Sequence, residues 1–216
     1  MRVLVIGANG KTGFLTVKEL KSDGKHEAYA MVRSEDQKER FENLGVKTVL
    51  CDLEESITPA LKDMDAVIFA AGSGSSTGKD KTVIIDQLGG IKAAVEAATE
   101  GAKRFIMLSA MNTKTDSESA IKHYHRAKAH CDNFIMNMHE IMDETLDWTI
   151  VCPGRLTDEA ATGLVEVDTN IDGKANTSRE HVAKAMVACL DKPNTIRKRF
   201  ALKEGEKNLH ESLDSL

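Results

Sequence analysis

The sequence predicts an α/β protein built on a doubly wound parallel sheet, and three observations support that prediction. Short apolar runs alternate with helical patterns along the chain, as in parallel strands joined by helices. The first apolar run, residues 3–6, has no polar position, which is typical of a strand covered on both faces. Three glycines, Gly7, Gly10 and Gly13, follow this strand and lead directly into a helical pattern.

Each strand is expected at an apolar or β-branched run, and each helix where apolar residues recur at helical spacing between capping signals. The expected strands cover residues 3–6, 26–33, 46–51, 65–71, 104–108, 148–152 and 199–203. The expected helices cover residues 11–21, 35–44, 59–62, 82–99, 119–144 and 177–190, and the last opens with a capping box from Thr177 to Glu180. A loop of small residues is expected at 73–80, irregular sequence with short strands at 156–176, and a polar tail, loose or helical, at the end.

Length and composition narrow the class of protein. The 216 residues, 41% of them hydrophobic and 29% charged, suit one domain with a substantial core. Residues 156–176 and 191–216 are expected to form a small C-terminal, substrate-side extension of that domain.

A net charge of −5 argues against nucleic-acid or membrane-surface partners. The four cysteines are scattered and suit free thiols in a reducing compartment, and no signal peptide or membrane span is visible. We therefore expect a cytoplasmic protein, monomeric or homodimeric, whose partner is a small-molecule substrate.

The glycine turn is the first candidate site. Gly7 would permit a tight turn, Gly10 would let the backbone approach a phosphate, and Gly13 would let the helix pack close to the strand. The helix N-terminus adds free N–H groups and a partial positive charge, which suits a dinucleotide pyrophosphate. The expected contacts within this turn are Gly7, Asn9, Gly10, Lys11, Thr12 and Gly13. The alternative is a glycine-rich turn that binds nothing.

Arg33 indicates which dinucleotide the chain would bind. An NAD site has a carboxylate near the end of the second strand for the ribose 2′-hydroxyl, but no acid precedes Glu35 here. A guanidinium suits a 2′-phosphate, and Lys11 could add a second cation. We therefore expect NADP as the cofactor, with NAD less favoured. The alternative is that Arg33 and Lys11 are simply solvated.

Tyr124 and Lys128 form a candidate acid–base pair. Their four-residue spacing places both side chains on one face of a helix. A phenol with a pKa near about 10 is a poor acid–base group at neutral pH, and a nearby ammonium lowers that pKa. Ser109, at the end of the fifth strand, could hydrogen-bond a substrate carbonyl while hydride arrives from a nicotinamide.

These motifs resemble the atypical short-chain dehydrogenase/reductase superfamily, in particular its NAD(P)-binding, NmrA-like and sugar-epimerase-like members, which have the Rossmann fold. The resemblance extends from Gly7 to about Leu190. Its motifs are Gly7-x-x-Gly10-x-x-Gly13, Asp52-Leu53, Ala71-Gly72, Ser109, Tyr124-x-x-x-Lys128 and Pro153-Gly154. The resemblance implies that the tyrosine is the acid–base, that the lysine also binds the nicotinamide ribose, and that the serine orients the substrate.

The same resemblance implies the remaining cofactor contacts. Asp52 and Leu53 correspond to an adenine-contacting pair, although Asp52 could equally cap the next helix. The small residues Ala70, Ala71 and Gly72 correspond to a motif beside the adenosine, and Pro153 and Gly154 to a pair beside the nicotinamide. The candidates Gly7, Arg33, Asp52, Gly72, Ser109 and Pro153 all follow strands, whose carboxyl ends share one edge of a parallel sheet.

Two departures from the superfamily affect the expected function. Its catalytic asparagine is missing, because Asp86 or Gln87 stands in the matching region. The region after residue 156 is also short for holding a sugar nucleotide.

We expect an NADP-dependent oxidoreductase or epimerase-like enzyme acting on a small carbonyl or alcohol. The alternatives are a non-catalytic NADP-sensing regulator and a flavin or biliverdin-type reductase. No metal site is expected, because His123 and His125 point to different sides of their helix and are predicted to face solvent, as is His130.

Overall fold

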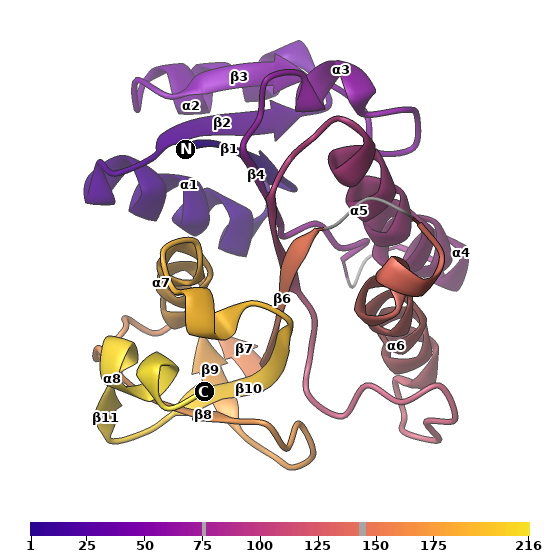
Figure 1. Ribbon diagram of the computed structural model, residues 1–216, viewed down its shortest axis with the longest axis vertical. Helices are drawn as coiled ribbons and strands as arrows, with labels where there is room; N and C mark the ends of the chain where they lie inside the picture. Colours follow the sequence, from indigo (N-terminus) through magenta and orange to yellow (C-terminus); the bar gives the residue numbers. More distant parts are fainter. Residues whose placement is uncertain (75–76, 143–145) are drawn as a thin grey trace.

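The computed structural model describes residues 1–74, 77–142 and 146–216, and within these residues it has a nine-stranded sheet with helices on both faces (Figure 1). The strand order is β11-β8-β10-β6-β5-β4-β1-β2-β3. The strands are β1 (Arg2–Ile6), β2 (Glu27–Val32), β3 (Lys47–Leu50), β4 (Ala66–Phe69), β5 (Arg104–Leu108), β6 (Asp147–Pro153), β8 (Leu164–Asp168), β10 (Lys198–Glu204) and β11 (Lys207–Asn208). The predicted doubly wound parallel sheet is confirmed.

The six strands β3-β2-β1-β4-β5-β6 pair in parallel and form the Rossmann part of the sheet. Strand β10 continues it in parallel beside β6, and β8 and β11 follow as antiparallel strands. The strand order reverses between β1 and β4. Ligands of open α/β sheets bind outside the carboxyl ends of the strands at such a switch point.

Helices cover both faces of this sheet, with α1 and α7 on one side and α5 and α6 on the other (Figure 1). The α-helices are α1 (Lys11–Asp23), α2 (Glu39–Glu42), α3 (Thr58–Leu61), α4 (Lys79–Lys81), α5 (Gly90–Thr99), α6 (Lys122–Met136), α7 (Arg179–Cys189) and α8 (Leu209–Asp214). Short 3₁₀ turns occupy Glu35–Gln37, Met138–Glu140 and Pro193–Thr195. A second, two-stranded sheet pairs β7 (Arg155–Thr157) with β9 (Asn176–Ser178).

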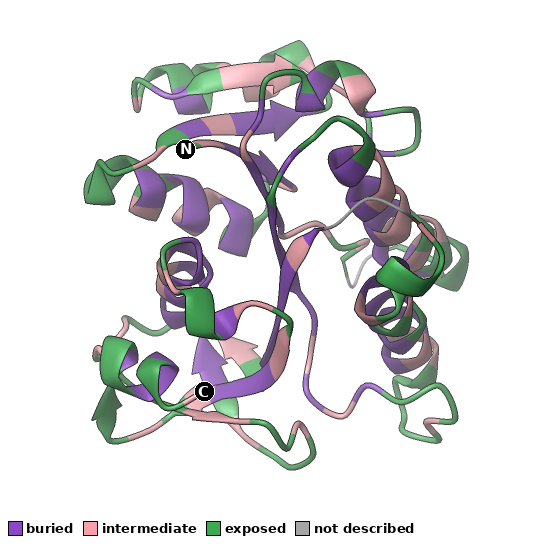
Figure 2. Cartoon of the chain, in the orientation of Figure 1, coloured by how far each residue is buried: buried purple, intermediate pink, exposed green. Residues whose placement is uncertain are grey.

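The sheet separates two hydrophobic cores because its central strands are buried on both faces (Figure 2). In β1, Val3 and Val5 join the core beneath α1 and α7, whereas Leu4 and Ile6 join the core beneath α5 and α6. This alternation follows from the two-residue period of a strand. It also explains why the sequence of β1 is apolar at every buried position.

Several elements differ from the sequence prediction. The helix expected at 35–44 is a 3₁₀ turn followed by the short helix α2. The helix expected at 82–99 begins as a π-helix, η2 (Thr82–Gly89), before α5 continues it. The tail, expected to be loose or helical, ends in the helix α8, so the second alternative is confirmed, and Leu209 and Leu213 of this helix are buried. The prediction for 73–80 and 119–144 falls partly on residues 75–76 and 143–144, outside the described residues.

The predicted capping box at 177–180 is displaced by one residue. Ser178, not Thr177, is the N-cap of α7, and its Oγ accepts a hydrogen bond of 3.0 Å from the His181 N–H. The Thr177 hydroxyl instead donates to the Leu202 carbonyl at 2.6 Å and thereby ties β9 to β10. The Glu180 carboxylate accepts from the Ala161 N–H. Tertiary bonds therefore determine which of two adjacent hydroxyls caps the helix.

Arg104 at the start of β5 is an arginine buried to 5% exposure, and its bonds go to neutral oxygens. Its guanidinium donates to the Asp147 and Cys189 carbonyls and to the Thr149 and Thr195 hydroxyls at 2.6–2.8 Å. Burial lowers the pKa of this guanidinium. The side chain joins β5, β6 and the end of α7 through one charged group.

Replacing Arg104 with methionine is expected to lower the free energy of unfolding by about 3 kcal/mol or more, because several buried acceptors lose their donor together. Urea denaturation followed by circular dichroism measures this loss. The control is Arg2→Met, because the Arg2 side chain is 42% exposed and its one ion pair with a described residue is a 4.0 Å contact with Asp63, so stability should change little. Equal effects of the two substitutions would contradict the structural role of Arg104.

Candidate functional site

The carboxyl ends of the parallel strands meet at a pocket of about 420 Å³. The residues that line it come from the ends of β1, β2, β3 and β4 and from the segment that leads into η2. Among the predicted site residues, the lining includes Gly7, Asn9, Gly10, Arg33, Asp52, Leu53, Ala70, Ala71 and Gly72. Gln37, Glu54, Ser73, Thr77, Lys81 and Ile85 line it as well. Four of the six strand ends that the sequence singled out, those of β1, β2, β3 and β4, therefore border one hollow, whereas Ser109 and Pro153 at the ends of β5 and β6 are not among its lining residues.

The glycine turn is as tight as its sequence predicts. Gly7 has a φ of +80°, and a Cβ there would lie 2.5 Å from the Ala71 backbone. A Cβ on Gly13 would lie 2.2 Å from the Gly7 carbonyl oxygen, so only glycine lets α1 pack this close to β1. A Cβ on Gly10 would approach only the Gly7 oxygen, at 3.3 Å, and Gly10 borders the pocket. Gly10 is thus the position where a bound group can reach the backbone.

The N-terminus of α1 is open to an anion. Gly10 is its N-cap, and no side chain of the described residues caps this helix. The N–H groups of a first turn lack partners within their own helix, so they suit a phosphate. Lys11 does not extend toward the pocket but forms an ion pair of 2.7 Å with Asp158, which also binds Arg179. Thr12 is buried in the helix, where its carbonyl accepts from the Thr16 hydroxyl.

Arg33 lies exposed at the end of β2 and borders the pocket. Its backbone N–H binds Gln37, and no ion pair of its guanidinium occurs within the described residues. Sequence reasoning missed Arg40, whose guanidinium stacks 3.4 Å above the Phe14 ring and donates to the Asn9 carbonyl and side chain. Arg40 lies seven residues after Arg33 and belongs to no motif. Its stacking partner on α1 is visible only once the helices are placed.

Asp52 and Leu53, the pair predicted to contact adenine, both line the pocket. One oxygen of Asp52 accepts from the Glu54 N–H at 2.9 Å, which closes a local turn before α3. Asp52 is exposed and borders the pocket, so the carboxylate both shapes the turn and faces the hollow. Leu53 is buried to 9% exposure and provides an apolar wall. Its backbone carbonyl accepts from Lys92.

Tyr124 and Lys128 lie together on α6, as their spacing predicts. The Lys128 ammonium is 6.0 Å from the centre of the Tyr124 ring and 3% exposed. It donates to the Leu108 carbonyl at 3.1 Å and forms a buried ion pair of 3.3 Å with Asp86. Burial by itself lowers the pKa of Lys128, but Tyr124 and the Asp86 carboxylate outweigh burial and raise it.

The expectation that Lys128 lowers the pKa of Tyr124 is wrong for the net effect. Burial raises the pKa of Tyr124, and the nearby carboxylates of Asp86 and Asp132 raise it further, whereas Lys128 alone lowers it. The net pKa lies above that of a free tyrosine. Burial is the largest of these causes, and Asp86, which stands in the region where the superfamily has its asparagine, adds to it.

Ser109 lies at the end of β5 as predicted, but its hydroxyl is engaged. It is 2% exposed and donates to Asp132 Oδ2 at 2.7 Å. Arg199 on β10 forms an ion pair of 3.0 Å with the same oxygen, and the Arg199 guanidinium also donates to the Thr113 hydroxyl. Burial raises the pKa of Asp132, and Arg199 opposes this shift. The Ser109 hydroxyl therefore donates its hydrogen bond to a carboxylate of the protein and not, as predicted, to a substrate carbonyl.

Asp132 could have been found from the sequence. It follows Tyr124 and Lys128 at the same four-residue spacing, so the three side chains share one face of α6. Arg199 could not, because it reaches this face from β10, which is far away in the sequence.

Pro153 is buried at the end of β6, and the Gly154 N–H donates to the Thr177 hydroxyl at 3.0 Å. A Cβ at Gly154 would lie 2.3 Å from the Ala175 carbonyl oxygen.

The histidines of α6 differ from the prediction that they face solvent. His125 is 9% exposed, and its Nδ1 lies 3.0 Å from the Ser119 hydroxyl. Burial lowers the pKa of His125. His130 is exposed, as predicted, and His123 is half-buried. Tertiary packing of the 111–119 loop covers His125, and this packing is not visible in the local sequence.

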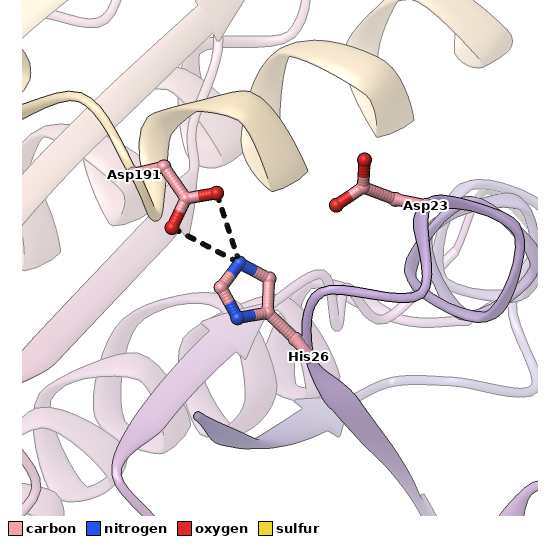
Figure 3. A group of neighbouring side chains, drawn as sticks. All are labelled: Asp23, His26 and Asp191. Carbon is pink, nitrogen blue, oxygen red and sulfur yellow. Dashed lines mark hydrogen bonds and ion pairs between the residues drawn. The ribbon is translucent and has the colours of Figure 1, made fainter.

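A second group of titratable residues lies at the opposite edge of the sheet (Figure 3). Potential ligand atoms of Asp23, His26 and Asp191 lie within 4.8 Å of one another. The His26 ring binds the Asp191 carboxylate at 3.2 Å, and the Lys25 ammonium lies 3.3 Å from Asp23 and 3.8 Å from Asp191. The ammonium therefore contacts both carboxylates, and we interpret the group as an ion-pair cluster.

Comparison with known proteins places the chain among nucleotide-binding proteins. The model of a family described as NAD(P)H-binding matches residues 7–193. The uncharacterized sugar epimerase YhfK of Bacillus subtilis is 40% identical over 222 residues, which cover 100% of both chains. No helix of the described residues is long and apolar enough to cross a membrane.

Two solved structures extend this similarity. One, described as an NAD-dependent epimerase/dehydratase from Bacillus halodurans, has a TM-score of 0.92 and 39% identity, with 100% of both chains covered. The oxidoreductase ylbE from Lactococcus lactis has a TM-score of 0.85 and 28% identity, covering 100% of this chain and 96% of the other.

Alanine substitutions at two glycines are expected to have different effects, a loss of stability at Gly13 and a loss of dinucleotide affinity at Gly10. Gly13→Ala forces the new Cβ against the Gly7 carbonyl and should cost about 1–3 kcal/mol of stability. Gly10→Ala meets no such obstacle, so stability should fall by less than about 1 kcal/mol. Dinucleotide affinity of Gly10→Ala should nevertheless fall more than about tenfold, because its Cβ points to where a phosphate would approach. Thermal melting and calorimetric titration measure the two effects, and a Gly10→Ala protein with unchanged affinity would contradict this role.

Proposed function

Since the chain belongs to the NAD(P)H-binding family, we propose that it is an NADP-dependent oxidoreductase that acts on a small carbonyl or alcohol substrate. The proposal is carried by two features at the same sheet edge: Arg33, whose guanidinium forms no ion pair within the described residues, borders the pocket, and Tyr124 lies beside the buried Lys128 on α6. The glycine turn and the open N-terminus of α1 fit a pyrophosphate.

The choice of NADP over NAD rests on charge at the end of β2. Arg33 faces the pocket, and Arg40 is held beside the glycine turn by Phe14 and Asn9. The nearest following acid, Glu35, is paired with Lys38 and not with Arg33. A phosphate ester accepts paired hydrogen bonds from a guanidinium, whereas a ribose hydroxyl gains little from one. Lys11 would join these cations only by leaving Asp158.

The reaction itself would use residues on α6. When bound, the nicotinamide supplies or accepts a hydride. Tyr124 would give a proton to the substrate oxygen or take one from it, and Lys128 would hold the nicotinamide ribose with the N–H that neither Asp86 nor Leu108 occupies. Ser109 is tied to Asp132, so its role would be to hold this carboxylate in place.

A sugar epimerase is the second candidate, because a relative with that name matches the full length of the chain. An epimerase oxidises and reduces one substrate with the same cofactor, so the cofactor shows no net change. The segment between β7 and β9 is short for holding a sugar nucleotide, which favours the smaller substrate. Incubation with NADPH and a panel of small carbonyl compounds distinguishes the two, since only a reductase consumes NADPH in proportion to product.

Calorimetric titration of the protein with NADP⁺ and NAD⁺ tests the cofactor. NADP⁺ is expected to bind at least about tenfold more tightly, a difference of about 1.4 kcal/mol. Arg33→Ala should remove most of this preference while leaving NAD⁺ affinity nearly unchanged. Arg2→Ala, at the opposite sheet edge, is the control and should change neither. Equal affinities of the wild-type chain for both dinucleotides would exclude Arg33 as a 2′-phosphate ligand.

Tyr124→Phe tests whether the chain is a catalyst or a sensor. In an oxidoreductase, loss of the hydroxyl should lower kcat by about 10²-fold or more, because proton transfer is lost, while NADPH affinity stays the same. His123→Phe, on the same helix turn, is the control and should retain turnover. A chain that binds NADPH but never consumes it, with or without Tyr124, would instead be a sensor. Turnover that persists in Tyr124→Phe would point to a flavin or biliverdin-type reductase.

A further inference from the structure

A buried carboxylate stands next to the proposed acid–base pair. Asp86 is 1% exposed, and its Oδ1 lies 3.3 Å from the ammonium of Lys128, whose side chain is 3% exposed. Lys128 is bound on another side by the Leu108 carbonyl. The ammonium thus lies between a full negative charge and a carbonyl dipole, out of contact with water.

The position of Asp86 is fixed from two directions. Its Oδ2 accepts a hydrogen bond of 2.9 Å from the backbone N–H of Ser73, which borders the pocket. A Cβ on Gly72 would lie 3.1 Å from Asp86 Oδ1, so the carboxylate packs directly on the strand end. Asp86 belongs to the π-helix η2, and such irregular turns are common at functional sites.

The titratable groups that influence the pKa of Tyr124 come from three elements. Lys128 and Asp132 lie on α6, Asp86 lies on η2, and Cys152 lies on β6. Arg199 is paired with Asp132 and offsets its charge. Burial has the largest effect and disfavours the phenolate. Lys128 favours the phenolate, and Asp86, whose carboxylate lies 3.3 Å from the Lys128 ammonium, opposes that effect.

Resting on the proposed function, we propose that Asp86 is a positioning residue that neutralises Lys128 and keeps the Tyr124 hydroxyl protonated, so that the site is built to donate a proton in carbonyl reduction. The carbonyl carbon gains a hydride from reduced nicotinamide dinucleotide, which is oxidised. The π electron pair moves to the carbonyl oxygen, which takes the Tyr124 proton and becomes an alcohol. The remaining phenolate, stabilised for that interval by Lys128, regains its proton from water.

The test measures ionisation of Tyr124 directly. The chain has two tyrosines, so Tyr29→Phe leaves Tyr124 as the only phenol. Tyrosinate absorbance is followed against pH in the protein without cofactor, with Trp148 fluorescence to confirm the folded state. In Tyr29→Phe, Tyr124 should remain un-ionised beyond pH 10, the ordinary midpoint being about 10. Adding Asp86→Asn, which retains the shape of the side chain, should lower the midpoint by about one pH unit or more.

Two further variants make the result specific to Asp86. Asp80→Asn, an exposed residue on α4, should leave the titration unchanged, and Asp132→Asn should shift it less than Asp86→Asn because Arg199 already balances Asp132. A Tyr124 midpoint at or below that of free tyrosine in Tyr29→Phe would overturn the proposal, even where Asp86→Asn does not fold. An unchanged midpoint in a folded Asp86→Asn protein would overturn it as well. Failure of the proposed function is seen separately, as absence of NADPH binding by calorimetry.

Discussion

The close contact between Gly13 of α1 and the Gly7 carbonyl is the constraint on which the site depends. A methyl group at position 13 would overlap this oxygen at 2.2 Å, so the helix can lie against β1 only with glycine there. That approach brings the N-terminus of α1 to the carboxyl end of β1, beside the switch between β1 and β4. The close approach of α1 to β1 therefore brings the unpaired N–H groups of the helix to the rim of the pocket.

The part of the sheet around β5 and β6 differs from the glycine turn at β1, because several charged side chains are buried there. Arg104 binds neutral oxygens at the start of β5, whereas Lys128 and Asp132 meet carboxylate and guanidinium partners near its end. Each buried charge has a partner, as the high cost of burying an isolated charge requires. Two carboxylate oxygens, on Asp86 and Asp132, still lack a hydrogen-bond donor within the described residues. Both belong to residues that contact the proposed catalytic side chains, Asp86 beside Lys128 and Asp132 beside Ser109.

Much of the fold was predictable because its signals are local. The apolar runs, the glycine spacing and the four-residue period of Tyr124 and Lys128 predict strands, turn and helix face without knowledge of distant contacts. The orientations of Ser109 and Lys11 were not predictable, since each depends on a partner more than twenty residues away, Asp132 and Asp158 respectively. The π-helical start at 82–89 also escaped prediction, because a π-helix has no distinct side-chain pattern. The roles of the site residues stay predictions.

The packing of α1 against α7 has a consequence for how the chain folds. Val17 and Leu20 of α1 share a core with Val182 and Met186 of α7, and β10 completes the sheet beyond β6. During synthesis the first helix therefore waits for residues 179–204 before its apolar face is covered. Contacts between segments this far apart in the sequence slow folding, and the partly synthesised chain exposes apolar surface until they form. The N-terminal half of the sheet can therefore acquire its final stability only after residues 179–204 have been synthesised.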